Sequence, residues 1–486
     1  MIIPASIEKL RTKLHGDLAL PGTDAYNDAI QVDNGRIQQH PQVVILAKSV
    51  ADVTCSMRFA KDNGLPLHIK AGGHSYAGYA LHSGGVLLDL SPMKRITFDE
   101  SRQLITVEMG ARWSDVYSFL QQSGTDYIPV GGGCTAVGVA GFVLGGGYSF
   151  VSRSYGLACD SLLALTIVTA DGVVRAVSPN SATVEERDLF WACQGGGGGN
   201  FGVVLEMTLR VYRPPTTKML AASLFYGIEH AADLICFYNE WAPSLPSEIA
   251  VYGYLGYIPD PCCPDRMLPI LRFQTVYNGD FTNGMELIRP LLERRPLKTE
   301  LYNLKLPDYL KIVGGSTAFK GRRSYTRSGI LLRGGLTSDF VRICLDRMKN
   351  TPSLDSFMLW MHQGGKTNTF SSEATAFPHR TAEFIFELAA VWNREDETRA
   401  NVEWAFQAGQ ELAGCFSGAY VNYIDPLLPN WQLMYYGQNY PRLLAIKRLW
   451  DPDDYFSFQQ SIGSTHTPSP AMPLNLEPLN RTVVGR

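Results

Sequence analysis

The sequence predicts an α+β protein built as two lobes. Its 486 residues are more than one hydrophobic core usually holds. In the first part of the chain, short apolar runs typical of strands alternate with helical patterns and glycine-rich loops. Glycine becomes less frequent after residues 211–215, and longer strands and amphipathic helices follow. We therefore expect one lobe from residues 1–214 and a second from 215–432, with the last segment, 433–486, returning to the first lobe.

The first lobe starts with a clear helix signal. Ser49 followed by Asp52 resembles a capping box, apolar residues then recur at helical spacing, and Gly64 ends the pattern. The elements expected next are strands at 65–70, 86–90 and 104–109 and a helix at 113–122.

A β-hairpin signal closes this lobe. The apolar runs 163–170 and 173–177 are joined by Asp171 and Gly172, a pair typical of tight hairpin turns. Farther along, the patterns predict a strand at 271–277, a helix at 401–412 and a returning helix at 440–450. The proline-rich tail from Thr465 has no periodicity, so we expect an extended or disordered segment there.

The composition excludes several classes of partner. There are 43 Lys and Arg against 46 Asp and Glu, a net charge of −3, and no basic run indicates nucleic acid or an anionic membrane. The first ten residues lack a sustained apolar segment, and no stretch is long enough to span a membrane, which favours a cytoplasmic location. Nine cysteines, an odd and scattered set, do not indicate a disulfide framework.

Two glycine-dense loops carry the chemistry. His74 lies within the loop 70–78, and Cys134 lies within the loop 131–138. Glycines let backbone N–H groups approach a pyrophosphate closely, and an imidazole or a thiol in such a loop could bond a flavin ring. The alternative is that His74 is an ordinary turn residue and Cys134 a small buried hydrophobe.

Two rival sites are weak. Residues 197–202 match G-x-G-x-x-G, but the β-branched run 203–209 that follows predicts a strand where a dinucleotide fingerprint needs a helix. His362 and His379 have no partners at metal-ligand spacing, so we expect no metal site. The segment 131–147 could be a flexible linker, but its interleaved apolar residues favour a buried backbone beside a cofactor.

Several segments resemble one known family. Residues 66–80, 131–160 and 191–204 are similar to the flavin-binding part of the berberine bridge enzyme branch of the vanillyl-alcohol oxidase superfamily. The runs 420–423 and 436–462 resemble its closing segment, and the likeness is weakest between about 215 and 350. The resemblance implies a PCMH-type FAD-binding domain at 1–214, an antiparallel-sheet substrate domain at 215–432, and a C-terminal segment at 433–486 that completes the FAD domain.

The resemblance also implies how the cofactor is held. FAD would be attached covalently through His74, at the C8 methyl group, and through Cys134, at the C6 edge. Val137 matches a position where valine is associated with reaction of the reduced flavin with oxygen. The remaining residues expected to bind the cofactor are Gly72, Gly73, Ser75, Gly78, Gly138, Gly141, Gly146, Gly156 and Val204.

Two residues are expected to be catalytic. Tyr423 matches the family's catalytic tyrosine, but an ordinary tyrosine pKa of about 10 requires a lowered value or a nearby proton acceptor. Glu387 lies in the apolar run 384–392, where a carboxylate is costly without a purpose. The resemblance aligns it with a glutamate base, and the alternative is a solvent-facing strand residue.

We therefore expect an FAD-dependent oxidase that takes a hydride from a small molecule and passes the electrons to molecular oxygen, giving hydrogen peroxide. Secondary-metabolite biosynthesis is the favoured role. The alternatives are an oligosaccharide oxidase that forms a lactone, and a non-redox cyclase or binding protein that uses flavin as a scaffold. Many aromatic residues in the expected substrate lobe suit stacking on a sugar or on an aromatic substrate, among them Tyr252, Tyr254, Tyr257, Phe357 and Trp360. The sequence does not indicate an oligomeric state.

Overall fold

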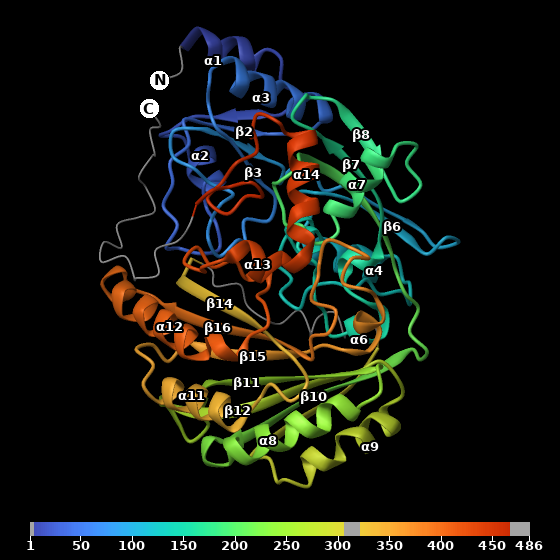
Figure 1. The fold of residues 1–486 in the computed structure, drawn as a ribbon, viewed down its shortest axis with the longest axis vertical. Coiled ribbons are helices and arrows are strands. Elements are labelled where there is room, and N and C mark those ends of the chain that lie inside the picture. Colours follow the sequence, from blue (N-terminus) through green and yellow to red (C-terminus); the bar gives the residue numbers. More distant parts are fainter. Residues whose placement is uncertain (1–3, 306–320, 467–486) are drawn as a thin grey trace.

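The computed structural model describes residues 4–305 and 321–466. A broad sheet backed by helices fills the lower half of Figure 1, and smaller sheets with the remaining helices fill the upper half. The α+β class predicted from the sequence is confirmed. The extended or disordered tail predicted from Thr465 lies, from residue 467 onward, outside the described residues.

Two small sheets form the upper half. The four-stranded sheet has the order β1 (Asp17–Ala19), β2 (Val43–Leu46), β4 (Val86–Asp89), β3 (Leu67–Lys70). Its strands β2, β4 and β3 are parallel, and β1 is antiparallel to β2. The five-stranded sheet is antiparallel, in the order β5 (Ile96–Asp99), β6 (Leu104–Glu108), β9 (Val203–Arg210), β7 (Leu162–Val168), β8 (Val174–Val177).

One antiparallel sheet of seven strands forms the lower half. Its order is β13 (Lys298–Lys305), β10 (Lys218–Gly227), β12 (Cys263–Tyr277), β11 (Ile249–Asp260), β15 (Phe357–His362), β16 (Phe384–Trp392), β14 (Arg323–Leu331). The chain crosses from the small sheets to this one between Arg210 and Lys218. The domain boundaries at 214 and 432 themselves stay predictions.

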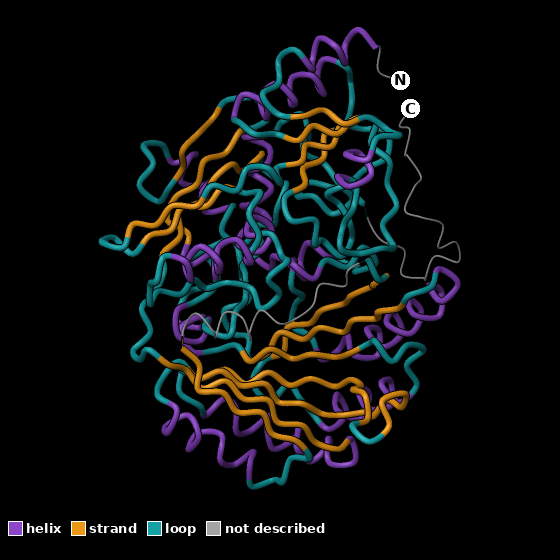
Figure 2. The backbone as a smooth tube through the Cα atoms, turned by 180° about the vertical axis from the view of Figure 1, so that it is seen from behind, coloured by secondary structure: helices purple, strands orange, loops and turns teal. Residues whose placement is uncertain are grey.

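The seven-stranded sheet is covered by helices on one face only. Figures 1 and 2 show these helices on the side away from the small sheets, and they are α8 (Ala231–Trp241), α9 (Phe281–Leu292), α11 (Ser338–Lys349) and α12 (Thr398–Leu412). The other face is turned toward the small sheets. The remaining α-helices are α1 (Pro4–Arg11), α2 (Asp24–Ala29), α3 (Val50–Asp62), α4 (Trp113–Gln122), α5 (Val139–Leu144), α6 (Ser152–Tyr155), α7 (Val184–Ala192), α13 (Trp431–Tyr436) and α14 (Tyr440–Trp450).

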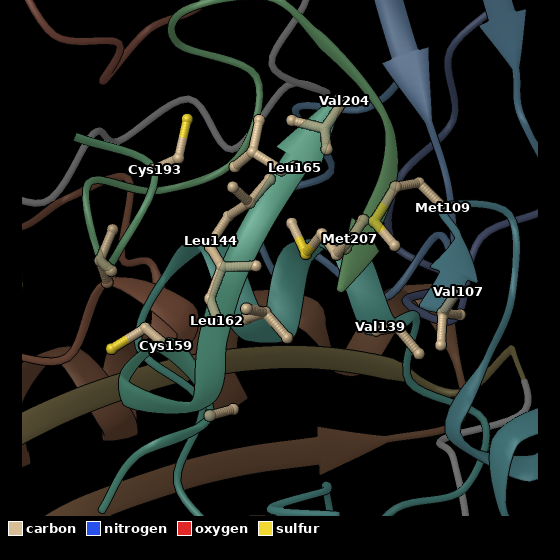
Figure 3. Packing of buried hydrophobic residues seen from close by; sticks show 14 of the residues in the cluster. Val107, Met109, Val139, Leu144, Cys159, Leu162, Leu165, Cys193, Val204 and Met207 are labelled. Carbon is tan, nitrogen blue, oxygen red and sulfur yellow. The ribbon is translucent and has the colours of Figure 1, made fainter. Parts of the chain in front are cut away.

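The main core joins the small sheets to α5 and to the end of the chain. Figure 3 shows Val139 and Leu144 of α5 beside Met207 of β9 and Leu165 of β7, all buried. The same core includes Leu443 and other apolar side chains of the last helix. The glycine-rich segment around α5 is therefore part of the packed core. The alternative that residues 131–147 form a flexible linker is wrong.

A buried lysine fixes the returning helix. The Lys447 ammonium on α14 donates to the Asn200 carbonyl at 2.9 Å, to the Phe456 carbonyl at 2.7 Å and to the Asp451 carboxylate at 2.5 Å. Because a buried cation needs several such acceptors, the contacts hold the C-terminal segment against the first part of the chain.

Most elements predicted from the sequence are confirmed within one to three residues. Helices α4 and α14 have the predicted bounds, and the hairpin of β7 and β8 turns at Asp171 and Gly172. The capping box is only half formed, since Ser49 caps α3 while the Asp52 carboxylate accepts hydrogen bonds from the backbone of His15 and Lys48 instead.

A buried ion pair anchors the segment after β15. Arg380 donates to the two carboxylate oxygens of Asp160 at 2.8 and 2.7 Å, and the side chains are 2% and 1% exposed. Asp160 follows α6, so the pair ties the sheet half to the first part of the chain. Such a pair is strongly destabilising to break because the remaining charge stays buried.

We predict that Asp160→Asn lowers the free energy of unfolding by about 3–5 kcal/mol, because Arg380 then lacks a counter-charge. Denaturant unfolding followed by intrinsic fluorescence measures the change. The exposed pair of Asp188 and Arg442 supplies the control, and Asp188→Asn should cost about 1 kcal/mol or less. Equal effects of the two substitutions would contradict the assignment.

Candidate cofactor and active site

A cavity of about 900 Å³ lies between the glycine-rich loops and the uncovered face of the seven-stranded sheet. Its size is at the upper end of the range for small-molecule and cofactor sites. Both halves of the molecule contribute to the wall, so residues distant in the sequence meet there.

The two predicted loops touch each other at glycine. A Cβ placed on Gly72 would lie 2.4 Å from the backbone nitrogen of Gly138, closer than any side chain allows. Gly73 beside it has a φ of +70°, which favours glycine. The sequence therefore lets the backbones of 70–78 and 131–138 pack directly, and this contact brings His74 and Cys134 to one cavity wall.

The His74 ring is buried and electrostatically tuned. Its Nδ1 lies 3.3 Å from the Gly72 carbonyl oxygen, and its Nε2 lies 3.6 Å from Asp33 Oδ1. Burial lowers the pKa of His74, and the Asp33 carboxylate opposes that shift. Nε2 is buried and has no hydrogen-bond partner in the described part of the chain. A neutral imidazole held this way is a competent nucleophile.

Most of the residues predicted to bind the cofactor line this cavity. They are Gly72, Gly73, His74, Ser75, Cys134, Val137, Gly138, Gly141 and Val204. Gly78, Gly146 and Gly156 do not line it and instead shape the chain behind it. All three have positive φ values, which favour glycine: +71° at Gly78, +114° at Gly146 and +92° at Gly156. A Cβ atom would press on Ile37 at Gly78, on Phe377 at Gly146 and on Asp160 at Gly156.

The sequence analysis missed several wall residues. Asp33 and Tyr76 face the cavity, as do Gly197, Gly198 and Gly199. Tyr76 lies within the His74 loop and could have been found by its spacing, whereas nothing near Asp33 indicates a site. The G-x-G-x-x-G stretch runs directly into strand β9, which confirms that it is not a dinucleotide fingerprint.

His362 and His379, the two histidines considered as metal ligands, have structural partners. His362 Nε2 lies 2.8 Å from Arg153 Nη1 and 3.2 Å from Glu383 Oε1. His379 Nε2 lies 3.1 Å from the Tyr435 carbonyl oxygen. Within residues 4–305 and 321–466, no three side chains of the metal-binding types come together.

Glu387 is a buried carboxylate on the cavity wall. It lies in β16, is 3% exposed and accepts a hydrogen bond of 2.8 Å from the Tyr76 hydroxyl. The alternative of a solvent-facing strand residue is therefore wrong. Burial raises the pKa of Glu387 to about 7. Hydrogen bonds with Tyr76 and Tyr423 stabilise the ionised carboxylate and so act in the opposite direction, lowering this pKa. A carboxyl group with this pKa can accept a proton near neutral pH.

Tyr423 lies next to this pair, at the end of the turn Val421–Tyr423. Its ring packs edge to face on Tyr76 at 5.8 Å and on Tyr420 at 5.2 Å between centroids. Its hydroxyl oxygen lies 3.5 Å from the Met361 sulfur, so this sulfur and the Glu387 carboxylate are alternative acceptors for its single proton. Burial and the nearby Glu387 carboxylate raise the pKa of Tyr423 well above its ordinary value, so its proton is hard to remove at neutral pH.

Hydrogen bonds to the glycine loops fix the turn that carries Tyr423. The Tyr420 hydroxyl accepts from the backbone N–H of Gly147 at 2.9 Å and from the Asn422 side chain at 2.9 Å. Asn422 also donates to the Phe142 carbonyl at 3.0 Å. These bonds set the position of the tyrosine relative to the cofactor loops.

Strand alternation divides the aromatic residues of the sheet between two faces. Tyr252, Tyr254 and Phe357 line the cavity. Tyr257, at the opposite strand parity, reaches the cavity edge but packs toward the covering helices, where its hydroxyl donates to the Met348 carbonyl of α11 at 2.9 Å. The expectation for Trp360 is wrong, because it is 0% exposed and packs in the core under the covering helices. Successive strand residues point to opposite faces, so Leu359 and Met361 take the cavity side.

No helix in the described parts of the chain combines the length and the apolar character needed to cross a membrane.

Two family models and several known proteins match this chain. The FAD binding domain family matches residues 41–178, and the berberine and berberine like family matches residues 419–463. The uncharacterized FAD-linked oxidoreductase YgaK of Bacillus subtilis is 30% identical, with 93% of this chain and 98% of that protein covered. The glucooligosaccharide oxidase of Sarocladium strictum is 26% identical, with 87% of each chain covered.

A solved structure shares the whole fold. The wild-type BBE-like 1 protein of Physcomitrella patens superimposes with a TM-score of 0.83 at 23% identity, with 94% of this chain and 98% of that chain covered. The fold, the two family matches and the full-length relatives together show that this chain belongs to the berberine bridge enzyme-like family of FAD-linked oxidoreductases.

Proposed function

We propose that the protein is an oxidase that holds FAD through covalent bonds to His74 and Cys134 and transfers electrons from a small molecule to oxygen, releasing hydrogen peroxide. The observation that carries the proposal is that one cavity brings both nucleophiles together with the buried pair of Glu387 and Tyr76. The residues proposed to bond the cofactor, His74 and Cys134, and the proposed proton acceptor Glu387 then line the same cavity.

The residues present fit FAD. Glycine backbones form the wall where a Cβ would block close approach, and His74 Nε2 is a buried polar atom with no hydrogen-bond partner among the described residues. When bound, the flavin accepts a hydride from the substrate and passes the electrons to oxygen. The remaining cofactor contacts that we propose are the cavity-lining glycines together with Ser75, Val137 and Val204.

We assign Glu387 the role of proton acceptor. With a pKa near 7 it is partly ionised at neutral pH, whereas Tyr423 keeps its proton. Tyr76 donates to Glu387 at 2.8 Å and orients the carboxylate toward the cavity. Tyr423 then acts as a hydrogen-bond donor to the substrate oxygen or nitrogen, or relays its proton to Glu387.

The substrate that we propose is a small molecule of secondary metabolism. The second candidate is an oligosaccharide, because a relative is a glucooligosaccharide oxidase and stacked rings of Tyr254 and Phe357, 5.5 Å apart, line the cavity. Oxygen consumption and peroxide release are measured with a panel of substrates from both classes, and the class that gives turnover identifies the substrate. Turnover without flavin reduction would indicate the non-redox alternative.

The first prediction of the proposed function concerns the attachment of the flavin. Acid-precipitated protein should stay yellow, and peptide mass spectrometry should find flavin on both His74 and Cys134. His74→Ala and Cys134→Ala should each keep one link, and the double variant should lose covalent flavin. Cys55→Ala, a partly buried cysteine away from the cavity, should keep both links. Complete release of flavin into the supernatant would exclude the proposal.

The second prediction concerns the base. The anaerobic rate of flavin reduction should rise with pH through about 7, because the Glu387 carboxylate must be ionised to accept a proton. Glu387→Gln should lower the rate by about a hundredfold to ten-thousandfold and remove this inflection. Tyr423→Phe should lower the rate and keep the inflection.

Glu383→Gln is the control for that series, since Glu383 is largely buried but does not line the cavity. It should keep the inflection. An unchanged pH profile in Glu387→Gln would show that another group accepts the proton.

The third prediction concerns oxygen. Val137 lines the cavity, and a smaller side chain leaves more room for dioxygen. Reoxidation of photoreduced enzyme in a stopped-flow instrument should be slower in Val137→Leu than in wild type. Because an added methylene can also overpack the wall at about 1–3 kcal/mol, the anaerobic reduction rate serves as the control and should change less. Reoxidation as fast as wild type would show that Val137 does not limit oxygen access.

A further inference from the structure

One row of paired residues crosses the cavity face of the seven-stranded sheet. Arg272 on β12 pairs with Tyr254 on β11, Tyr254 pairs with Leu359 on β15, and Leu359 pairs with Glu387 on β16. All four residues line the cavity. The Cα atoms of Arg272 and Glu387 are thus three strand spacings apart, about 14 Å.

The Arg272 guanidinium contacts aromatic rings instead of carboxylates. Its Cζ atom lies 4.6 Å from the Tyr254 ring centroid and 6.0 Å from that of Phe225, the residue paired with it on β10. Its Nε atom is buried and has no hydrogen-bond partner within residues 4–305 and 321–466.

The carboxylates at this end of the cavity already have cationic partners. Glu300 lies 2.6 Å from the Lys298 ammonium, and Asp355 lies 3.1 Å from the Arg322 guanidinium. Glu387 is three strands away. Among the described residues Arg272 forms no ion pair, and Glu300, which already pairs with Lys298, acts on its charge only from farther away.

This arrangement carries a free-energy cost. Burial lowers the pKa of Arg272, although a guanidinium remains charged in proteins. The Arg272 side chain is half-buried, and the hydration that it loses is replaced only in part by the rings of Tyr254 and Phe225 and by the more distant Glu300 carboxylate. An anion that enters the cavity would restore the missing interaction, and this favours an acidic ligand.

We propose that Arg272 binds a carboxylate group of the substrate, at the end of the cavity opposite Glu387. The inference rests on the proposed oxidase function and names its substrate class: an organic acid whose reacting C–H bond lies roughly 10–14 Å from its carboxylate, as the strand spacing dictates. The planar fork of the guanidinium matches a carboxylate in a bidentate contact, and the Tyr254 ring offers an apolar surface for the substrate body.

Binding of matched probes to the oxidised holoenzyme tests the site without turnover. The probes are biphenyl-4-carboxylate, biphenyl-4-carboxamide and biphenyl-4-yl phosphate, measured by isothermal titration calorimetry and by perturbation of the flavin absorbance. In wild type the carboxylate should bind about tenfold or more tighter than the carboxamide, because its hydrogen bonds are charge-assisted.

Substitution of the arginine should remove that preference. Arg272→Met keeps the apolar stem and should bring the affinity ratio close to one, whereas Arg272→Lys keeps the charge but not the fork and should give an intermediate ratio. The double variant Arg322→Gln with Asp355→Asn removes a cavity ion pair without changing the net charge, and it should keep the wild-type ratio. Flavin content and unfolding midpoints are matched first.

Three outcomes would overturn the inference: equal affinities of carboxylate and carboxamide in wild type, an unchanged ratio in both Arg272 variants, or a preference for the phosphate. If the carboxylate preference follows Arg272 but no organic acid reduces the flavin, the anion site stands and the proposed oxidase function fails. For an acid that does reduce the flavin, Arg272→Met should raise KM about tenfold or more with kcat within about threefold.

Discussion

The hydrogen bond from the Tyr76 hydroxyl to Glu387 is the contact on which the site depends. It joins a glycine loop near the start of the chain to a strand more than three hundred residues later. A carboxylate 3% exposed is costly unless a donor or a proton satisfies it. Tyr76 satisfies it only in part, so the carboxyl group keeps a raised pKa of about 7 and remains available to accept a proton.

The two faces of the seven-stranded sheet explain why a carboxylate can lie there at all. On β16, Phe384, Phe386 and Leu388 point into the core under the covering helices, and Glu387 points into the cavity. The same alternation puts Arg272 and Tyr254 on the cavity side. Helices cover one face. On the other face, apolar side chains such as Met361 and Ile385 pack into the main core, and the part around Glu387 and Arg272 borders the cavity. The covered face stabilises the sheet, and the open face determines what binds.

Local sequence patterns predicted the features that depend on neighbouring residues, namely the glycine loops and the helices and strands. The glycine loops placed His74 and Cys134 on one wall, and helix and strand periods located most of the predicted elements within one to three residues, although the strand predicted at 271–277 already begins at Cys263. Contacts between distant segments were not predictable. No signal in the sequence pairs Tyr76 with Glu387 or Asp33 with His74. The face taken by Trp360 depended on strand register, which a single apolar run does not reveal.

The state of Glu387 can be observed directly. Infrared difference spectra of the oxidised holoenzyme, titrated between about pH 5 and pH 9 around the pKa of interest, should show a protonated carboxyl band that disappears as the pH rises through about 7. Glu387→Gln should lack this band, and Tyr76→Phe should shift its midpoint upward because the carboxylate loses a donor. A midpoint near the ordinary glutamate value, or a band that persists in Glu387→Gln, would contradict the account.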